Sequence, residues 1–169
     1  NGTFLSCEAG KNVVFSYQPK LNGAGFDLER SNFVTTNEEG EFAGSDFIGG
    51  GNNISADIKT LFRPSDVAIG PDGAIYITDW YDGRVGGHQD LDETCSGTIY
   101  RIAPKGFKPR IPKLDLSTTA GQIEALKSPA PNVRNLGFVA LKEQGSSAVP
   151  AISKLLKNKN FFIAARAIF

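Results

Sequence analysis

Residues 63–106 read RPSDVAIGPDGAIYITDWYDGRVGGHQDLDETCSGTIYRIAPKG, and this stretch decides the fold class of the chain. In three short runs, apolar residues recur at close spacing among small or polar ones: Val67 and Ile69, Ile75 and Ile77, Ile99 and Ile102. Alternation with a period of two predicts β-strands for the first two runs, and Ile99 and Ile102 mark a third strand. The Pro71-Asp72-Gly73 segment supplies a tight turn between the first two runs, so we expect an antiparallel meander.

The beginning of the chain repeats this design. Residues 2–8 superpose on residues 73–79, and residues 12–17 fall where residues 97–102 fall. A repeat of about 70 residues built from meanders favours propeller blades with insertions, and a chance similarity of two hairpins is the alternative. Residues 26–35 predict an outer strand, entered through a turn at Asn22-Gly23-Ala24-Gly25.

The length of the chain does not suit a complete propeller. Such a fold needs at least four blades, and about two are visible in these 169 residues. The chain contains no Met and ends inside a predicted helix. We therefore expect it to be part of a longer protein and to be inactive alone.

Charge and glycine divide the chain near Phe107. Residues 1–106 hold 8 Lys and Arg against 15 Asp and Glu, whereas residues 107–169 hold 10 against 3. Of the 19 glycines, 16 precede residue 107, as is typical of a turn-rich β region followed by a helical one. The basic residues are scattered singly, which argues against nucleic-acid binding and favours attraction between the two halves.

Compartment signals are few. No apolar run approaches the ~20 residues of a membrane span, and no signal peptide is visible. Cys7 and Cys95 allow one disulfide, and two free thiols are an equal alternative.

Beyond a Pro-containing linker at residues 107–114, the apolar period changes from 2 to 3.6. Ser117 or Thr118 is expected to cap a helix that carries Ile123 and Leu126, and Asn132 to cap a helix over residues 133–143. We expect the apolar residues of this second helix to point inward: Val133, Leu136, Val139 and Ala140. Residues 149–157 and 161–169 are predicted to form two further helices.

Short helices joined by tight turns stack as antiparallel pairs in α-solenoids. Residues 128–169 resemble HEAT repeats, with Pro131-Asn132-Val133-Arg134 opening one helix, Gly145 at the turn and Ala148–Ile152 beginning the next. A generic helical bundle is the alternative. The expected organisation is a partial β-propeller at residues 1–106, a linker at 107–114 and a HEAT-like segment at 115–169.

Chemistry is expected at one end of the second meander. Residues 63–66 and the loop after Asp79 emerge at the same end of the sheet, where propellers hold ligands around their channel. Compared with the first blade, this loop carries an insertion at residues 81–97. Its residue types can bind a hard cation or exchange protons, with Asp79 at its root: Asp82, His88 and Asp90. A solvated acidic loop with a structural His88 is the alternative.

Two further groups at this end suit a ring-shaped, anionic ligand. Arg63 directly precedes the first strand and presents a planar fork for a carboxylate or quinone oxygen, unless it forms a salt bridge with Asp66 or Asp79. Trp80 and Tyr81 can stack on a ring, although aromatic residues also pack between blades.

These motifs resemble the last blade of soluble pyrroloquinoline-quinone (PQQ) sugar dehydrogenases: RPSDV at residues 63–67, GPDGAIYITD at 70–79 and GTIYRI at 97–102. The longer form, TDWYDGRVGGH before GTIYRIAPKG, looks like the large dehydrogenase-like proteins of planctomycetes and verrucomicrobia. The resemblance implies β plus α architecture, with the C-terminal blades of a six-bladed propeller followed by an α-solenoid of HEAT-like helices. The family's blade begins Arg-x-Arg-Asp-Val, and Ser65 stands here in place of the second arginine.

The resemblance implies a periplasmic or otherwise exported oxidoreductase that acts on a sugar or alcohol, with PQQ and calcium as cofactors. The electron acceptor would be a cytochrome c or a haem domain further along the protein. Arg63, Asp66, Trp80 and Tyr81 are the expected cofactor contacts, and no catalytic residue is assigned, because the family's catalytic histidine belongs to an earlier blade. A non-catalytic propeller and solenoid that binds carbohydrate or protein is one alternative, which Ser65 favours. A metal-dependent lactonase-like propeller is another.

Overall fold

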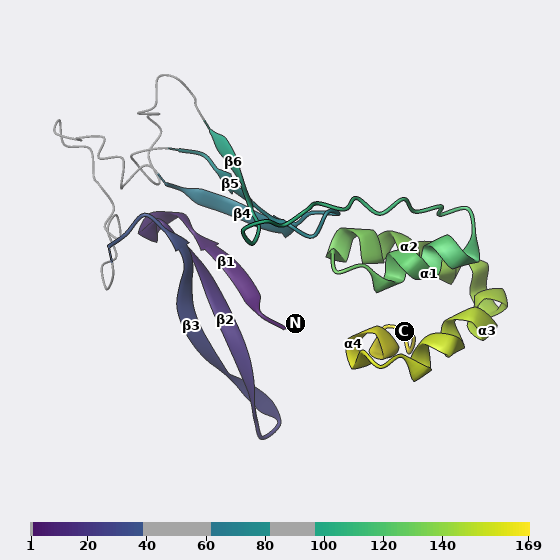
Figure 1. Cartoon of the computed structure of the whole chain (residues 1–169). Helices are drawn as coiled ribbons and strands as arrows, with labels where there is room; N and C mark the ends of the chain where they lie inside the picture. The colour runs from purple at the N-terminus through teal and green to yellow at the C-terminus, as the bar shows by residue number, and fades with distance from the viewer. Residues whose placement is uncertain (1, 39–61, 82–96) are drawn as a thin grey trace. The chain divides into compact units, whose positions relative to one another are not determined.

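The structure, a computed structural model, describes residues 2–38, 62–81 and 97–169. It contains two small antiparallel sheets and several helices, so the fold is a mixed one of β-sheets and α-helices (Figure 1). Two compact units are distinguished. One comprises residues 1–68 and 76–102, and the other comprises residues 69–75 and 103–169. Each unit is described by itself.

The first sheet is a meander in the order β1-β2-β3. Strand β1 (Phe4–Glu8) leads through a 3-10 turn, η1 (Ala9–Lys11), into β2 (Val13–Asn22), and β3 (Gly25–Thr35) follows. Phe4 lies opposite Tyr17, and Asn22 lies opposite Gly25. Gly23 has a φ of 56°, which a two-residue hairpin turn requires and glycine adopts without strain. The predicted turn is therefore confirmed, and so is a strand over residues 26–35, which is the edge strand β3 of this sheet.

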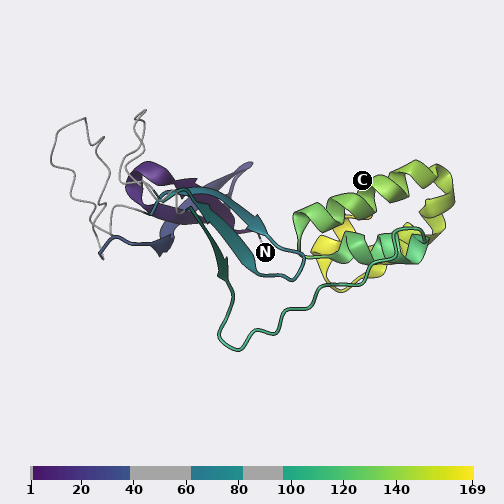
Figure 2. The ribbon, with the colours of Figure 1, turned by 90° about the horizontal axis from the view of Figure 1, so that it is seen from above.

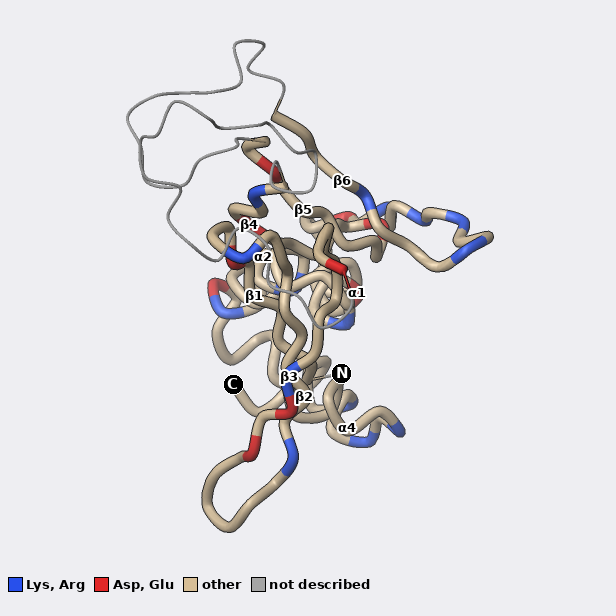
Figure 3. The backbone as a smooth tube through the Cα atoms, turned by 90° about the vertical axis from the view of Figure 1, so that its left-hand side faces the viewer, with Lys and Arg blue, Asp and Glu red and all other residues tan. Residues whose placement is uncertain are grey.

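The far part of the β2–β3 hairpin is amphipathic. Opposite residues share a face, which places Leu21 beside Phe26 on one side, and both side chains are exposed. On the other side Lys20 forms an ion pair with Glu29 at 2.5 Å. Figure 3 shows acidic and basic residues together along this hairpin. The beginning of β2, which is paired with both β1 and β3, is buried instead: Val13 and Val14 are fully buried.

The second sheet has the order β4-β5-β6, with β4 (Pro64–Ile69), β5 (Ile75–Asp79) and β6 (Thr98–Ile102). The predicted turn between β4 and β5 is confirmed. The N–H of Gly73, whose φ is 86°, donates to the carbonyl of Gly70 at 2.9 Å. The side chain of Asp72 accepts a bond from the N–H of Ala74 at 3.1 Å, which fixes the end of the turn.

Residues 103–118 connect to the helices without regular secondary structure (Figures 1 and 2). The helices are α1 (Thr119–Lys127) and α2 (Pro131–Gln144), then α3 (Val149–Ile152) and α4 (Phe161–Ala165). Two 3-10 segments flank α3, namely η3 (Gly145–Ala148) and η4 (Ser153–Lys157). Thr118 caps α1 as expected, because its hydroxyl accepts a bond from the N–H of Gly121 at 3.1 Å.

The start and the orientation of α2 differ from the prediction. The helix begins at Pro131, whose missing N–H suits the first helical position, so Asn132 is not the cap. Leu136 and Val139 were expected inside but are 53% and 43% exposed. The buried side is centred on Val133, Gly137 and Leu141, because the absent side chain of Gly137 lets α2 approach α1 closely.

The later helices are shorter than predicted. Residues 149–157 form a short α-helix that tightens into 3-10 geometry, and the fourth helix ends at Ala165. One buried apolar cluster of the helical unit joins α1, α2 and both 3-10 segments: Leu126, Leu141, Ala148 and Leu155. A second cluster is formed by Ala125, Ala130 and Val133. In the described parts of the chain, no helix has the length and apolar character needed to cross a membrane.

Candidate functional site

Asp79, at the end of β5, accepts hydrogen bonds from three residues in different parts of the second sheet and its flanking segments. The residue is buried, with 3% of its surface exposed. Oδ1 accepts bonds from the N–H of Arg63 at 2.7 Å and of Tyr81 at 2.8 Å, and Oδ2 accepts one from the hydroxyl of Tyr100 at 3.2 Å. Bonds from several donors satisfy a buried carboxylate. The residue therefore ties the end of β5 to the beginning of β4 and to β6.

Arg63 joins the two sheets. It is 1% exposed, and its Nη1 donates to the carbonyl of Ala9 at 2.8 Å, in the short turn between β1 and β2. Its own carbonyl accepts a bond from the N–H of Trp80 at 3.2 Å. A buried guanidinium must be hydrogen-bonded to offset the loss of hydration. In this structure the Arg63 side chain therefore holds the first sheet against the second.

Asn12 reinforces the same junction from the first sheet. Its φ of 52° is left-handed, a conformation that Asn tolerates better than most residues, and the residue is fully buried. Its Nδ2 donates to the carbonyl of Phe62 at 2.6 Å. The hydroxyl of Thr35 donates to the carbonyl of Asn12 at 2.7 Å. The turn between β1 and β2 is thus fixed from several sides.

Tyr100 lies on the other side of Asp79. Its ring meets that of Phe62 edge to face, with the centroids 6.0 Å apart. Partial burial raises the pKa of the Tyr100 hydroxyl, and the negative charge and hydrogen bond of Asp79 raise it further. Both effects favour the neutral phenol, because ionisation would place two negative charges together.

The predicted cofactor contacts do not share one environment. Arg63 is buried, whereas Trp80 is 45% exposed and Tyr81 is half-buried with a φ of 54°. Asp66 is exposed, and its Oδ1 accepts a bond from the N–H of the next residue, Val67. Ser65 stands where the resembled family has its second arginine, and its hydroxyl is 2.8 Å from that of Thr78.

Of the predicted metal ligands, the structure describes only Asp79. Asp82, His88 and Asp90 lie outside the described residues. Among residues 2–38, 62–81 and 97–169, no group of three or more His, Cys, Asp or Glu side chains is arranged to hold a metal ion. The metal assignment therefore stays a prediction.

Cys7 is a half-buried free thiol on β1, and Cys95 lies outside the described residues. Burial raises the pKa of the Cys7 thiol, and the charge of Asp66 raises it further. A raised pKa lowers the thiolate fraction at neutral pH, so Cys7 is a weak nucleophile.

Sequence reasoning missed three members of this junction. They are Asn12, Phe62 and Tyr100. Asn12 donates a hydrogen bond to Phe62, 50 positions later, and the ring of Phe62 contacts that of Tyr100, nearly 40 positions further along the chain. A periodic pattern of apolar residues does not reveal contacts between residues so far apart in the sequence. A usable signal was the Asn residue after a three-residue turn, since Asn is enriched at left-handed positions.

The comparisons with known proteins bear on the two sheets. Residues 1–106 match the model of a family described as a domain of unknown function, DUF7133. The chain belongs to this family. The DUF7133 match contains both sheets and the whole Arg63 and Asp79 junction, and the helices α1–α4 lie beyond it. No curated protein and no solved structure matched the chain.

Proposed function

We propose that this chain is a section of a β-propeller of the PQQ-dependent sugar or alcohol dehydrogenase type, followed by HEAT-like helical repeats. In this proposal β1 and β5 are equivalent strands of successive blades, as are β2 and β6. The support is that both sheets are three-stranded meanders and that residues 2–8 repeat residues 73–79. Strand β4 is then the innermost strand of its blade, and β3 is an outer strand of the preceding one.

The single observation that carries the proposal is the position of the sequence motifs on the second sheet. RPSDV opens β4, GPDG forms the turn before β5, and GTIYRI is β6. The three motif segments therefore coincide with the strands and the turn that this part of a propeller blade would need. The proposal for the helices is supported by α1 and α2, which pack closely as an antiparallel pair does in a solenoid.

The described residues do not by themselves fit a quinone. The guanidinium of Arg63 is buried against a main-chain carbonyl, and the hydroxyl of Ser65 faces Thr78. We therefore place no step of the reaction on them. In the proposed protein this region is a wall of the ligand site, and Trp80, with an exposed indole, is its best-placed contact with a ring.

The experiment uses the protein at its natural length. It is titrated with PQQ in the presence and absence of Ca²⁺, and reduction of an electron-acceptor dye is followed with a panel of sugars and alcohols. We expect PQQ and Ca²⁺ together to produce dye reduction. Trp80→Ala should weaken quinone binding, whereas Phe161→Ala, which removes another exposed aromatic ring but outside the DUF7133 match, should not. Absence of both quinone binding and dye reduction contradicts the assignment.

A second candidate is a non-catalytic propeller and solenoid that binds carbohydrate or protein. The burial of Arg63 and the replacement of the family's second arginine by Ser65 favour it. The same titration distinguishes the two, because this candidate predicts saturable binding of a carbohydrate or protein ligand without any response to PQQ and Ca²⁺.

A further inference from the structure

Two arginines of the helical unit lie next to each other at the C-terminal end of α1. Nη1 of Arg134, on α2, donates to the carbonyl of Pro129 at 2.7 Å and, more weakly, to that of Ser128 at 3.4 Å. Nη1 of Arg166, which follows α4, donates to the carbonyl of Leu126 at 3.0 Å and to that of Ser128 at 3.1 Å. Because both contact the carbonyl of Ser128, the two cations are neighbours.

The charge of this arginine pair is only partly balanced. The last carbonyls of α1 carry the negative end of the helix dipole, equivalent to about half an elementary charge. Burial lowers the pKa of Arg166, and the positive charge of Arg134 lowers it further. Within the described residues the ion pairs are Lys20 with Glu29 and Lys127 with Glu124, so neither arginine has a carboxylate partner there. An anion brought to this place would relieve the repulsion.

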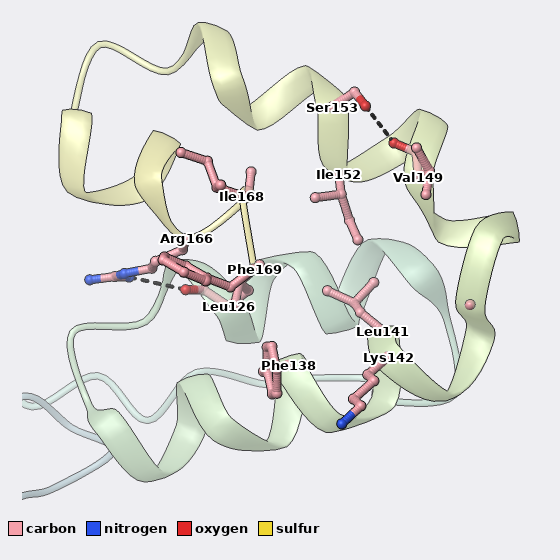
Figure 4. A pocket seen from close by; sticks show the side chains of 12 residues that line it. Leu126, Phe138, Leu141, Lys142, Val149, Ile152, Ser153, Arg166, Ile168 and Phe169 are labelled. Carbon is pink, nitrogen blue, oxygen red and sulfur yellow. Dashed lines mark hydrogen bonds between the residues drawn. The ribbon is translucent and has the colours of Figure 1, made fainter.

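Two neighbouring cavities open beside the arginine pair. The smaller, of about 260 Å³, is bordered by both arginines and by the rings of Phe138 and Phe169. The larger, of about 330 Å³, shares Arg166 and both rings with the first. As Figure 4 shows, apolar side chains line the larger cavity: Leu141 from α2, Ile152 from α3 and the more exposed Ile168 from the segment after α4.

We propose that these cavities bind a carboxylate that carries an unbranched apolar tail, such as a medium-chain fatty acid. The planar guanidinium groups match a carboxylate in shape and charge, and each arginine retains N–H donors beyond Nη1. The tail would lie in the larger cavity, among the apolar side chains. The combined volume is in the range of small-molecule sites, which have apolar walls and a few convergent polar groups.

This inference is independent of the proposed function. The arginine pair and both cavities lie in residues 126–169, outside the DUF7133 match at residues 1–106. Failure of quinone binding therefore leaves the carboxylate site untouched, and the reverse is also true.

The first test compares three small molecules on the unaltered chain by isothermal titration calorimetry at pH 7. Octanoate, below its micellar concentration, has both head and tail; octan-1-ol lacks the charge, and acetate lacks the tail. We expect one octanoate per chain, with octanol bound about tenfold more weakly, as the loss of a charge-assisted hydrogen bond implies. Acetate should show no binding in the same range. Octanol binding as tight as that of octanoate overturns the proposal, and so does acetate binding of equal strength.

The second test changes one arginine. Arg134→Gln should weaken octanoate about tenfold and leave octanol unchanged. Arg110→Gln, an exposed arginine in the connection before the helices, is the matched control and should change neither. If Arg134→Gln binds octanoate like the unaltered chain, the arginine pair is not the carboxylate site. The comparison of ligands on the unaltered chain decides the question even if this variant folds poorly.

Discussion

Asp79 has hydrogen-bond partners that its residue type and its place in the sequence do not reveal. An aspartate at the root of an acidic loop is expected to bind a metal, and that role stays a prediction. In the structure its two oxygens accept bonds from two main-chain N–H groups and a tyrosine hydroxyl. The N–H that Tyr81 donates belongs to a residue with a left-handed backbone conformation, and a periodic pattern of apolar residues does not predict such a conformation. The position of Asp79 was therefore predictable, and its partners were not.

Tyr100 should titrate above the ordinary tyrosine range because of its contact with Asp79. Burial raises its pKa first, and the neighbouring carboxylate raises it further. The folded chain then holds the phenolic proton more tightly than the unfolded chain does. This contribution to stability is fully present below the unfolded pKa of about 10 and is lost as the pH rises through the folded value.

The measurement is the absorbance of tyrosinate at 295 nm against pH, with the curve of Tyr100→Phe subtracted from that of the unaltered chain. The difference should have its midpoint above pH 10, and Asp79→Asn should move it down. Tyr76→Phe serves as the control, because its removal should leave the Tyr100 midpoint in place. A Tyr100 midpoint at or below pH 10 would mean that the phenol and the carboxylate do not interact as the structure shows.

At the scale of elements, the sequence was most informative where local chemistry decides the outcome. The turn at Gly23 and the turn ending at Gly73 both followed from glycine's tolerance of positive φ. The orientation of α2 did not follow, because apolar residues surround most of that helix. Gly137 selects the side of α2 that faces α1, because its missing side chain permits close contact. A pattern based only on apolar residues does not take this glycine into account.

Gly137→Ala should destabilise the helical unit although alanine is the better helix former. A Cβ at residue 137 would lie 2.5 Å from the carbonyl oxygen of Gln122 and 2.7 Å from the nitrogen of Leu126, both main-chain atoms. Main chain cannot move aside without separating α1 from α2. The gain in helix propensity is about 1 kcal/mol. Overpacking typically costs 1–3 kcal/mol, occasionally more, and clashes this short with main chain should exceed the gain, so we expect a net loss of about 1–2 kcal/mol.

The measurement is urea denaturation followed by circular dichroism at 222 nm. Asn135→Ala, on the exposed side of the same helix, is the control and should be neutral or slightly stabilising. A Gly137→Ala chain as stable as the unaltered one would show that α1 and α2 are further apart than the structure places them.

At the scale of the molecule, composition predicted the change from sheets to helices, since glycine and acidic residues are concentrated before residue 107. The junction between the two sheets was not predictable in this way. It rests on contacts between residues far apart in sequence, such as Arg63 with Ala9, which only a folded chain brings together. Local propensity gives the elements, and long-range hydrogen bonds of buried polar groups select how the sheets meet.

The main buried clusters of the sheets and of the helices are distinct, and of the described sheet residues only Ile69, at the end of β4, packs against the helical clusters, so we expect two unfolding transitions. The fully buried apolar side chains of the sheets include Val13 and Ile77, whereas the helices have their own cluster around Leu141. The only tryptophan, Trp80, reports on the sheets by fluorescence, and circular dichroism at 222 nm reports chiefly on the helices. Asp79→Ala leaves the buried N–H of Arg63 and the half-buried N–H of Tyr81 without their acceptor, which should cost about 2–3 kcal/mol and move the fluorescence transition alone. Gly137→Ala should move the dichroism transition alone, because distant and independent sites act additively. If each variant shifts both transitions by the same amount, the chain unfolds as one cooperative body, and the hydrogen bonds of Asp79 support the helices as well as the sheets.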